Sequence, residues 1–268
     1  FCWALEHGAK AIIQMDAESH QDVFEIDNES LFKWIDKEKK LPTTAAPSPG
    51  QFFDAFSQCF EDGADEVLCL TISSEMSATY TSARQAADLI PGNRVTIMDT
   101  RSLSLGEGYM ALAAAEAVSQ GGSIQDALRC AEDVRNRTHL FGALSTLKYI
   151  AMSGRVGQLA ANMAGVLNIK PILTARNGKL ELLEKIRTQN KAWERLIELS
   201  KMQLGQRPIE KIAIVNVNAR EDAGKFQSML RVADIHTGEA EIIDMNPGLA
   251  VHTGAGLIAV VFIVGENL

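Results

Sequence analysis

The chain has 268 residues, of which 46% are hydrophobic and 22% are charged, a composition that suits one large or two ordinary globular domains. Its net charge of -8 argues against a nucleic-acid backbone or an anionic membrane surface as the main partner, because both would repel it. The longest apolar run, residues 257–264, is too short to cross a bilayer and predicts a buried strand. We therefore expect no nucleic-acid partner and no membrane-spanning segment.

The first fourteen residues, FCWALEHGAKAIIQ, have neither the basic region nor the long apolar core of a secretory signal, so we expect a cytoplasmic protein. The cysteines are scattered without a CxxC spacing, which predicts reduced, mostly buried thiols and no metal site: Cys2, Cys59, Cys69 and Cys130. The GxGxxG, P-loop, HExxH and GxSxG signatures are absent, so no cofactor is expected.

In the first half of the chain, short apolar runs alternate with amphipathic stretches, which predicts an α/β domain with a mainly parallel sheet flanked by helices. The predicted strands cover residues 9–15, 65–73 and 93–100, and the predicted helices cover residues 30–40, 47–63, 77–90 and 108–122. Residues 41–50, LPTTAAPSPG, are predicted to be a loop that ends in a Ser48 helix cap and a first-turn Pro49. We place this domain over residues 1–137.

The second half is richer in strands, which are predicted over residues 139–146, 168–187, 209–217, 239–245 and 256–265. Arg176-Asn177-Gly178-Lys179 is a strong hairpin turn inside the second of these stretches. Because hairpin strands run antiparallel, residues 138–268 are predicted to form a separate α+β domain with a mainly antiparallel sheet.

Residues 72–83, ISSEMSATYTSA, carry four serines and two threonines directly after a buried strand. Residues 73–79 would form the loop at the carboxyl end of that strand and the first turn of the next helix, where open α/β sheets bind ligands. Free N–H groups, the helix dipole and the Ser74 and Ser77 hydroxyls suit a carboxylate or a phosphate. The alternative is a simple serine N-cap with the other hydroxyls in solvent.

Other polar residues have weaker signals. Thr43 and Thr44 could reach the same sheet edge or serve only a turn, and His252 and Thr253 precede a glycine-rich turn. Arg155 on a tight turn and Arg187 at the end of a strand could form an exposed cationic spot, although most arginines are solvated surface charges.

Two apolar or glycine-rich segments are also ambiguous. Residues 106–108, GEG, suggest close helix–strand packing more than a phosphate loop. Residues 159–169, LAANMAGVLNI, suggest core packing or the wall of an apolar tunnel.

Taken together and in this order, seven segments make the chain resemble the DegV family of bacterial fatty-acid-binding proteins: LPTTAAPSPGQF, ISSEMSATYTSA, VTIMDTRSLSLGEG, LKYIAMSGRVG, VLNIKPILTARNGKL, EKIRTQNKA and VHTGAGLIAVVF. The resemblance implies two α/β domains with a long-chain fatty acid buried in a tunnel between them. It also implies a protein that is not an enzyme but presents the bound carboxylate to a separate fatty-acid kinase, which forms an acyl phosphate. By position, the carboxylate would be held by Thr43 or Thr44, Ser74 or Ser77, and His252 with Thr253, and the kinase would face Arg155 and Arg187.

The chain departs from that pattern in two places. Glu75 and Ala78 stand where the family usually has glycine, and Glu75 would bring a negative charge close to an anionic head group. The family usually opens with a short strand that ends in Asp-Ser, whereas this chain begins in ALEHGAK, which we expect to be helical. Either the sequence is incomplete at its start or another segment takes that place in the first sheet.

Two other functions stay open. A hydrolase or acyltransferase could use Ser77 or Ser74 with His252 as the base. A sensor of a small anionic metabolite would need only the first domain.

Overall fold

The computed structural model describes residues 11–16, 18–21, 25–154, 169–235 and 240–266. It divides into two compact units that do not follow the chain order. Unit 1 comprises residues 1–22, 44–136 and 177–179, and unit 2 comprises residues 23–43, 137–176 and 180–268. The predicted domain limits at 137 and 138 stay a prediction; the units differ from them over residues 23–43 and 177–179.

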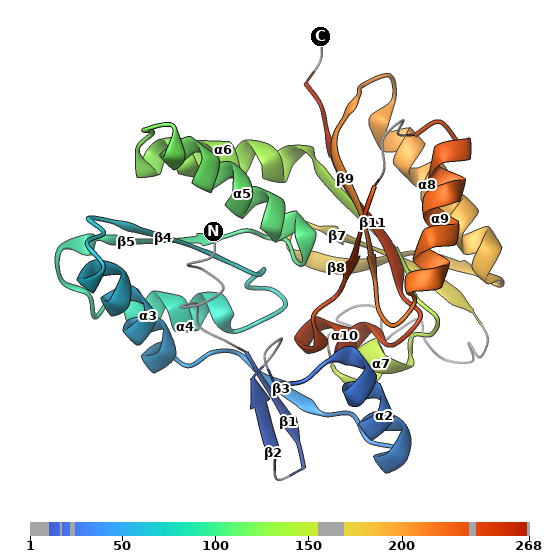
Figure 1. Cartoon of the computed structure of the whole chain (residues 1–268), viewed down its shortest axis with the longest axis horizontal. Coiled ribbons are helices and arrows are strands. Elements are labelled where there is room, and N and C mark those ends of the chain that lie inside the picture. The colour runs from blue at the N-terminus through green and yellow to red at the C-terminus, as the bar shows by residue number, and fades with distance from the viewer. Residues whose placement is uncertain (1–10, 17, 22–24, 155–168, 236–239, 267–268) are drawn as a thin grey trace. The chain divides into compact units, whose positions relative to one another are not determined.

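Unit 1 is built on a parallel pair of strands, β4 and β5, that have helices on both sides (Figure 1). Its elements from residue 49 onward are α3 (Pro49–Glu61), β4 (Val67–Thr71), α4 (Thr79–Ala87), the short 3-10 helix η1 (Pro91–Asn93), β5 (Val95–Asp99), α5 (Leu105–Ser119) and α6 (Ile124–Arg137). In Figure 1, α3 and α4 lie on one side of the pair and α5 and α6 on the other. The mainly parallel first sheet with flanking helices is thereby confirmed.

The α3 helix begins where the sequence predicts. The Ser48 hydroxyl accepts a hydrogen bond from the Gln51 N–H, the Gln51 side chain accepts one from the Ser48 N–H, and Pro49 occupies the first turn. Phe52 and Phe56 of this helix then pack with Ala83 of α4, and this contact forms the core on that side of the sheet.

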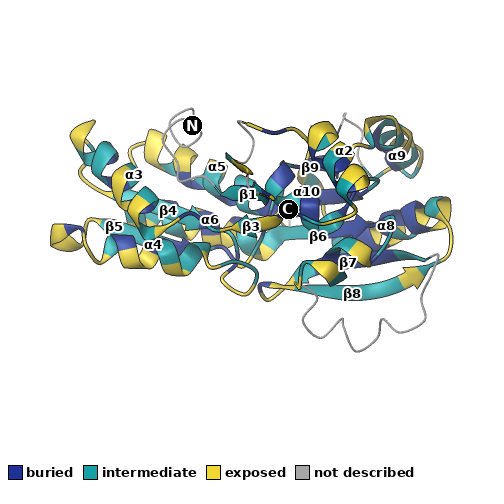
Figure 2. Cartoon of the chain, turned by 90° about the horizontal axis from the view of Figure 1, so that it is seen from below, coloured by how far each residue is buried: buried dark blue, intermediate teal, exposed yellow. Residues whose placement is uncertain are grey.

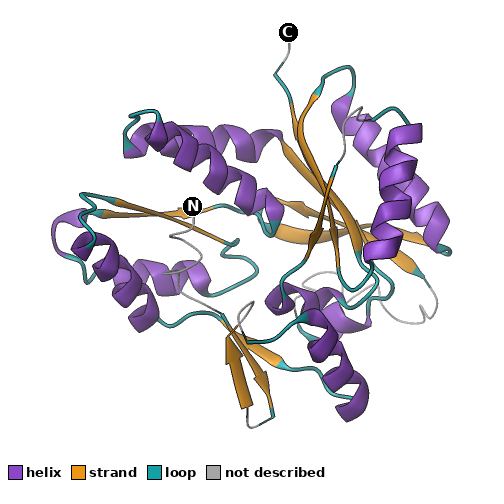
Figure 3. Cartoon of the chain, viewed as in Figure 1, coloured by secondary structure: helices purple, strands orange, loops and turns teal. Residues whose placement is uncertain are grey.

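A separate, three-stranded sheet has the order β2-β1-β3, and Figure 3 draws its strands in orange. It is formed by β1 (Ile12–Met15), β2 (Glu18–Gln21) and β3 (Thr43–Ala45), with β1 and β2 antiparallel. The expectation that residues 41–50 are all loop is therefore wrong for Thr43–Ala45, which pair as a strand before Pro47 and Ser48 turn the chain into α3.

Unit 2 contains a six-stranded sheet with the order β10-β9-β11-β6-β7-β8. The strands are β6 (Thr138–Ala143), β7 (Lys170–Arg176), β8 (Lys179–Ile186), β9 (Ile209–Asn216), β10 (Glu241–Asp244) and β11 (Ile258–Val264). The β9–β10 pair is parallel, whereas β11 is antiparallel to both β9 and β6, and β6 is antiparallel to β7. The mainly antiparallel sheet predicted for residues 138–268 is confirmed.

The central strand of this sheet, β11, is buried along its whole length, as its uninterrupted apolar sequence predicts. Two helices, α8 (Gln189–Leu204) and α9 (Arg220–Val232), pack on the sheet, where Trp193 and Phe226 meet Phe262 in one apolar cluster. The edge strand β8 is only partly buried, and Figure 2 draws it mostly in the intermediate colour.

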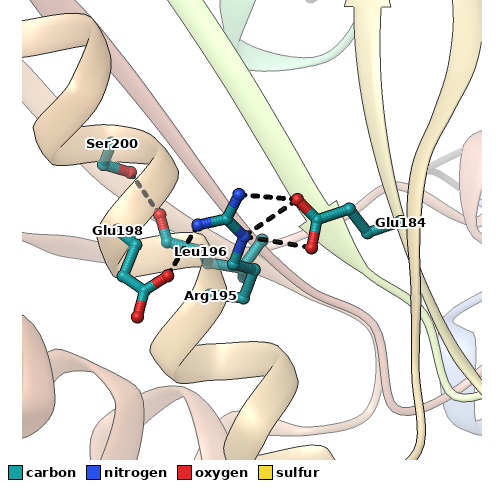
Figure 4. A network of polar contacts seen from close by, with 5 residues as sticks. All are labelled: Glu184, Arg195, Leu196, Glu198 and Ser200. Atoms are coloured by element: carbon teal, nitrogen blue, oxygen red, sulfur yellow. Dashed lines mark hydrogen bonds and ion pairs between the residues drawn. The ribbon is translucent and has the colours of Figure 1, made fainter.

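A polar network fastens α8 to that edge strand (Figure 4). The Arg195 guanidinium donates to both oxygens of Glu184 on β8 at 2.7 to 3.0 Å, and Nη1 donates to Glu198 one turn further along α8 at 2.6 Å. A bidentate pair of this kind fixes orientation as well as distance, so it holds the helix in register with β8.

The β7–β8 hairpin turns as predicted, because Asn177 and Gly178 both have positive φ, 52° and 82°. Three shorter helices belong to unit 2: α2 (Asn28–Glu38), α7 (Lys148–Met152) and α10 (Pro247–Thr253). They contact one another through α10, and the Phe32 ring of α2 meets the Tyr149 ring of α7 edge-on at 5.9 Å.

The three described cysteines are free, but only Cys59 is buried, Cys69 is partly buried and Cys130 is exposed. The expectation of mostly buried thiols is therefore wrong for Cys130. The predicted helix in ALEHGAK lies outside the described residues. Among the described residues, no strand other than β5 pairs with β4, and no helix combines the length and the apolar character needed to cross a bilayer.

A substitution at Gly254, which follows α10, can test how closely α10 packs against α7. This glycine has φ 82° and ψ 160°, and a Cβ there would lie 2.2 Å from the Tyr149 ring. We expect Gly254→Ala to lower the free energy of unfolding by about 2–4 kcal/mol, because strain and a clash add. Calorimetric unfolding should show Gly224→Ala in α9, where nothing lies within 4 Å of a new Cβ, unchanged or slightly stabilised. Equal effects of the two substitutions would contradict this account.

Candidate functional site

The β4–α4 loop, residues 72–78, leaves β4 at the edge where β5 also ends. The register pairs Thr71 with Asp99, so the last residues of both parallel strands lie side by side. The Thr100 hydroxyl donates to the Thr71 carbonyl at 2.8 Å and closes the two strand ends together. The predicted location of the hydroxyl-rich stretch, at the carboxyl end of a strand and the start of a helix, is confirmed.

Ser73 is fully buried and anchors this loop. Its N–H donates to the Ser102 carbonyl at 2.9 Å, and its hydroxyl donates to the Gly178 carbonyl at 2.6 Å while it accepts from the Glu75 N–H at 3.3 Å. Its carbonyl accepts the N–H groups of Met76 and Ser77 at 3.0 and 3.1 Å. Because each polar group of Ser73 has a partner inside the protein, Ser73 cannot serve a ligand.

Ser74 is exposed, but its hydroxyl is committed to Asp99. The hydroxyl donates to Asp99 Oδ2 at 2.6 Å, and the Ser74 and Arg101 N–H groups donate to Asp99 Oδ1 at 3.2 and 2.9 Å. A serine has one hydroxyl proton, and a carboxylate accepts only. Ser74 therefore has no proton for an anionic ligand, and a ligand anion placed there would also face the Asp99 charge.

The Ser77 hydroxyl, unlike that of Ser74, accepts a hydrogen bond from a backbone N–H. Ser77 is half-buried, its hydroxyl lies 2.7 Å from that of Thr79, and it accepts the Thr79 N–H at 3.3 Å. When the Thr79 hydroxyl is the donor, both lone pairs of Ser77 are filled and its proton points outward. The α4 helix begins at Thr79 with no side-chain cap from Ala78, but the Ser77 hydroxyl accepts the Thr79 N–H in its first turn, so one serine does bond the helix start as the capping alternative expects.

The Glu75 side chain on this loop forms an ion pair. Its carboxylate lies 3.4 Å from Lys179 Nζ, on the turn that also carries Gly178. A Cβ on Gly178 would lie 2.7 Å from Ser73 Oγ, so the turn can approach the loop only because that residue is glycine.

Glu107 lies in the first turn of α5, which packs on β4. Burial and, to a lesser extent, the Asp99 carboxylate raise its pKa to about 8. Burial, followed by Glu107 and Cys59, raises the pKa of the Cys69 thiol to about 12. At neutral pH, Glu107 thus holds a proton and can act as a hydrogen-bond donor.

The remaining predicted site residues fall in different parts of the chain. Thr44 is half-buried and belongs to unit 1, as Ser74 and Ser77 do. Thr43 is exposed and is the last residue of segment 23–43, which belongs to unit 2. In unit 2, His252 is half-buried on α10, and the Thr253 hydroxyl donates to the Ala250 carbonyl at 3.3 Å.

Arg187 is exposed directly after β8. Arg155 and residues 159–168 of the predicted tunnel wall lie outside the described residues. No group of three or more His, Cys, Asp or Glu side chains suited to a metal ion occurs in the part of the chain that the structure describes.

Sequence reasoning missed Ser73, Asp99 and Glu107. Asp99 is the last residue of β5 and the last but one of the predicted strand 93–100, beside the hydroxyl-rich loop, and that position could have marked it. In the sequence, residues 106–108 suggest glycine packing or, more weakly, a phosphate loop, and they lie in the first turn of α5. Nothing in the sequence signals the burial that changes the protonation of Glu107.

The fold and this polar edge define the class of protein: a two-unit α/β protein whose first sheet is parallel and whose second is mainly antiparallel. A family model described as "Uncharacterised protein, DegV family" matches residues 10–265, and the chain belongs to that family. A DegV domain-containing protein of Deinococcus radiodurans is 32% identical over 254 residues, which cover 94% of this chain and 89% of the relative.

Solved structures of similar proteins agree. A DegV family protein from Thermus thermophilus, described for its fatty acid binding, has a TM-score of 0.90 and 27% identity over 98% of this chain and 94% of its own. A protein from Thermotoga maritima, described as revealing a fatty acid binding function, has a TM-score of 0.80 and 26% identity over 99% of this chain and 95% of its own.

Glu107 gives the protein a pH dependence that can be measured. Because its pKa rises from the ordinary 4.5 to about 8, its contribution to stability is fully present below pH 4.5 and is lost as the pH rises to about 8. Between pH 5.5 and 8.5 we expect this group to lower the free energy of unfolding of the wild type by about 3 kcal/mol, and Glu107→Gln should abolish that pH-dependent loss.

Urea unfolding at the two pH values compares the wild type with Glu107→Gln and with Glu116→Gln, an exposed glutamate of the same helix. Only the first substitution should flatten the difference between the two pH values. A profile that Glu107→Gln leaves unchanged would show that this carboxyl titrates normally.

Proposed function

We propose that the protein binds a long-chain fatty acid, encloses its acyl chain and presents the carboxylate to a separate fatty-acid kinase for acyl-phosphate formation. The observation that carries the proposal is the contact set of the Ser77 hydroxyl, which accepts the Thr79 N–H at 3.3 Å and keeps its own proton for an anion when the Thr79 hydroxyl, 2.7 Å away, is the donor of that pair. The fatty acid binding of the similar proteins from Thermus thermophilus and Thermotoga maritima supports it. The interdomain tunnel stays a prediction from the sequence.

The energetics give the acyl tail and the head-group residues different roles in binding. A tail of about sixteen carbons gains on the order of 12 kcal/mol when it leaves water, before entropy losses. A carboxylate buried without partners would cost several kcal/mol. The head-group residues are therefore needed to offset desolvation. We propose Ser77, Thr44 and His252 for this role, with Thr43 and Thr253 beside them in the sequence.

Ser77 and Ser74 can be separated by experiment. Native mass spectrometry should show the wild-type protein with the added mass of one fatty acid. Displacement of a fluorescent fatty acid should show an affinity that is about 10–100-fold lower in Ser77→Ala, because a hydrogen bond to a charged group is lost. Ser74→Ala is the matched control and should keep its affinity within a factor of about three, since its hydroxyl serves Asp99.

Wild-type protein that is persistently empty would refute fatty acid binding. A larger loss of affinity in Ser74→Ala than in Ser77→Ala would show that Ser74, and not Ser77, binds the head group. The same variants test the hydrolase that we considered. Turnover of p-nitrophenyl esters that disappears in both Ser77→Ala and His252→Ala would replace a binding protein by an enzyme.

The kinase-facing role that we propose for Arg187, with Arg155, has its own test. Arg187 is exposed and follows β8, so its removal should leave the lipid content unchanged. We expect Arg187→Ala to lower acyl-phosphate formation by a kinase-containing extract about tenfold, since a cation that meets a partner is lost. Lys201→Ala, an exposed cation on α8, is the control and should have no effect. Loss of bound lipid in Arg187→Ala would mean that this residue is structural.

A further inference from the structure

Glu75 is the only charged residue of the β4–α4 loop. It precedes Ser77 by two positions, so the two Cα atoms are at most about 7 Å apart. That separation is shorter than the Debye length of about 8 Å at physiological ionic strength. An uncompensated Glu75 carboxylate would therefore repel any anion that accepts the Ser77 proton.

Lys179 is held opposite Glu75 by contacts that do not depend on the ion pair. The neighbouring Gly178 carbonyl accepts the hydroxyl of fully buried Ser73 at 2.6 Å, which fixes the turn against the loop. The Lys179 ammonium then lies 3.4 Å from the Glu75 carboxylate. The two side chains are 65% and 50% exposed, so the pair itself contributes little to folding.

The neighbouring charges do not replace Lys179. Arg176, at the other end of the turn, lies 3.5 Å from Glu181. The Arg101 backbone N–H donates to Asp99, whose carboxylate adds a second negative charge to this edge, and among the described residues Lys179 is the only cation within 4.0 Å of the Glu75 carboxylate. Lys179 is thus the cation paired with Glu75 among the contacts of this loop.

We propose that Lys179 is a specificity-determining residue that neutralises Glu75 and so lets the β4–α4 loop accept a carboxylate. The proposal rests on the proposed function, because it assumes that a fatty acid carboxylate occupies the loop. It attributes to the Lys179 charge a preference for anionic over neutral ligands of the same chain length.

The experiment compares hexadecanoate with hexadecan-1-ol, which has the same tail and no charge, by displacement of a fluorescent fatty acid. Lys179→Gln should lower the affinity for hexadecanoate about three- to tenfold and leave that for hexadecan-1-ol within about twofold. Glu75→Gln combined with Lys179→Gln should restore hexadecanoate binding, since the repelling charge is gone. Arg176→Gln is the matched control on the same turn and should change neither affinity.

Several results would overturn the proposal: no loss in Lys179→Gln, an equal loss for both ligands, no recovery in the double variant, or the same selective loss in Arg176→Gln. An equal loss would point to displacement of the loop instead of charge. Wild-type protein that binds neither ligand would refute the proposed function, and that result is separate because it is obtained before any substitution is made.

Discussion

The arrangement of the β4–α4 loop depends on two anchors, the buried Ser73 and the Asp99 carboxylate. Ser73 uses its N–H, hydroxyl and carbonyl inside the protein, and Asp99 accepts three donors from residues 74 and 101. These bonds all join groups of the protein itself, and a loop restricted in this way has less ordering entropy to lose on binding. A loop that is fixed beforehand can present the Ser77 hydroxyl and the start of α4 at the parallel sheet edge, where strand ends and helix N-termini favour anions.

The same contacts show why a count of hydroxyls overstates a binding site. Ser73 and Ser74 follow β4 directly and look as suitable as Ser77 in the sequence, yet a buried carbonyl and a carboxylate hold their protons. Ser77 differs because its hydroxyl accepts the Thr79 N–H, and its other contact is with the Thr79 hydroxyl, where either oxygen can be the donor. The number of donors that a ligand can use is therefore smaller than the composition of the loop implies, and it depends on acceptors that come from other elements.

The local features of this chain could be predicted because short-range physics decides them. The Ser48 cap with Pro49, the Asn177-Gly178 turn and the uninterrupted apolar strand β11 each depend on neighbouring residues. The partners in the site could not be predicted, since Ser73 and Gly178 are 105 residues apart. Thr43–Ala45 was expected as loop because its pairing partner lies elsewhere in the chain, and no single-sequence pattern reports the burial that raises the pKa of Glu107.

Three carboxyl groups lie on or near the β4–α4 loop, and each has a different kind of partner or environment that limits its negative charge. Backbone and hydroxyl donors solvate Asp99, Lys179 pairs with Glu75, and the raised pKa of about 8 leaves Glu107 protonated at neutral pH. An acidic protein with a net charge of -8 would otherwise repel an anionic ligand. Local compensation at this edge reduces that repulsion without positive charge on the loop itself, so in the proposed function neutral hydroxyl and backbone donors would replace the water around a carboxylate.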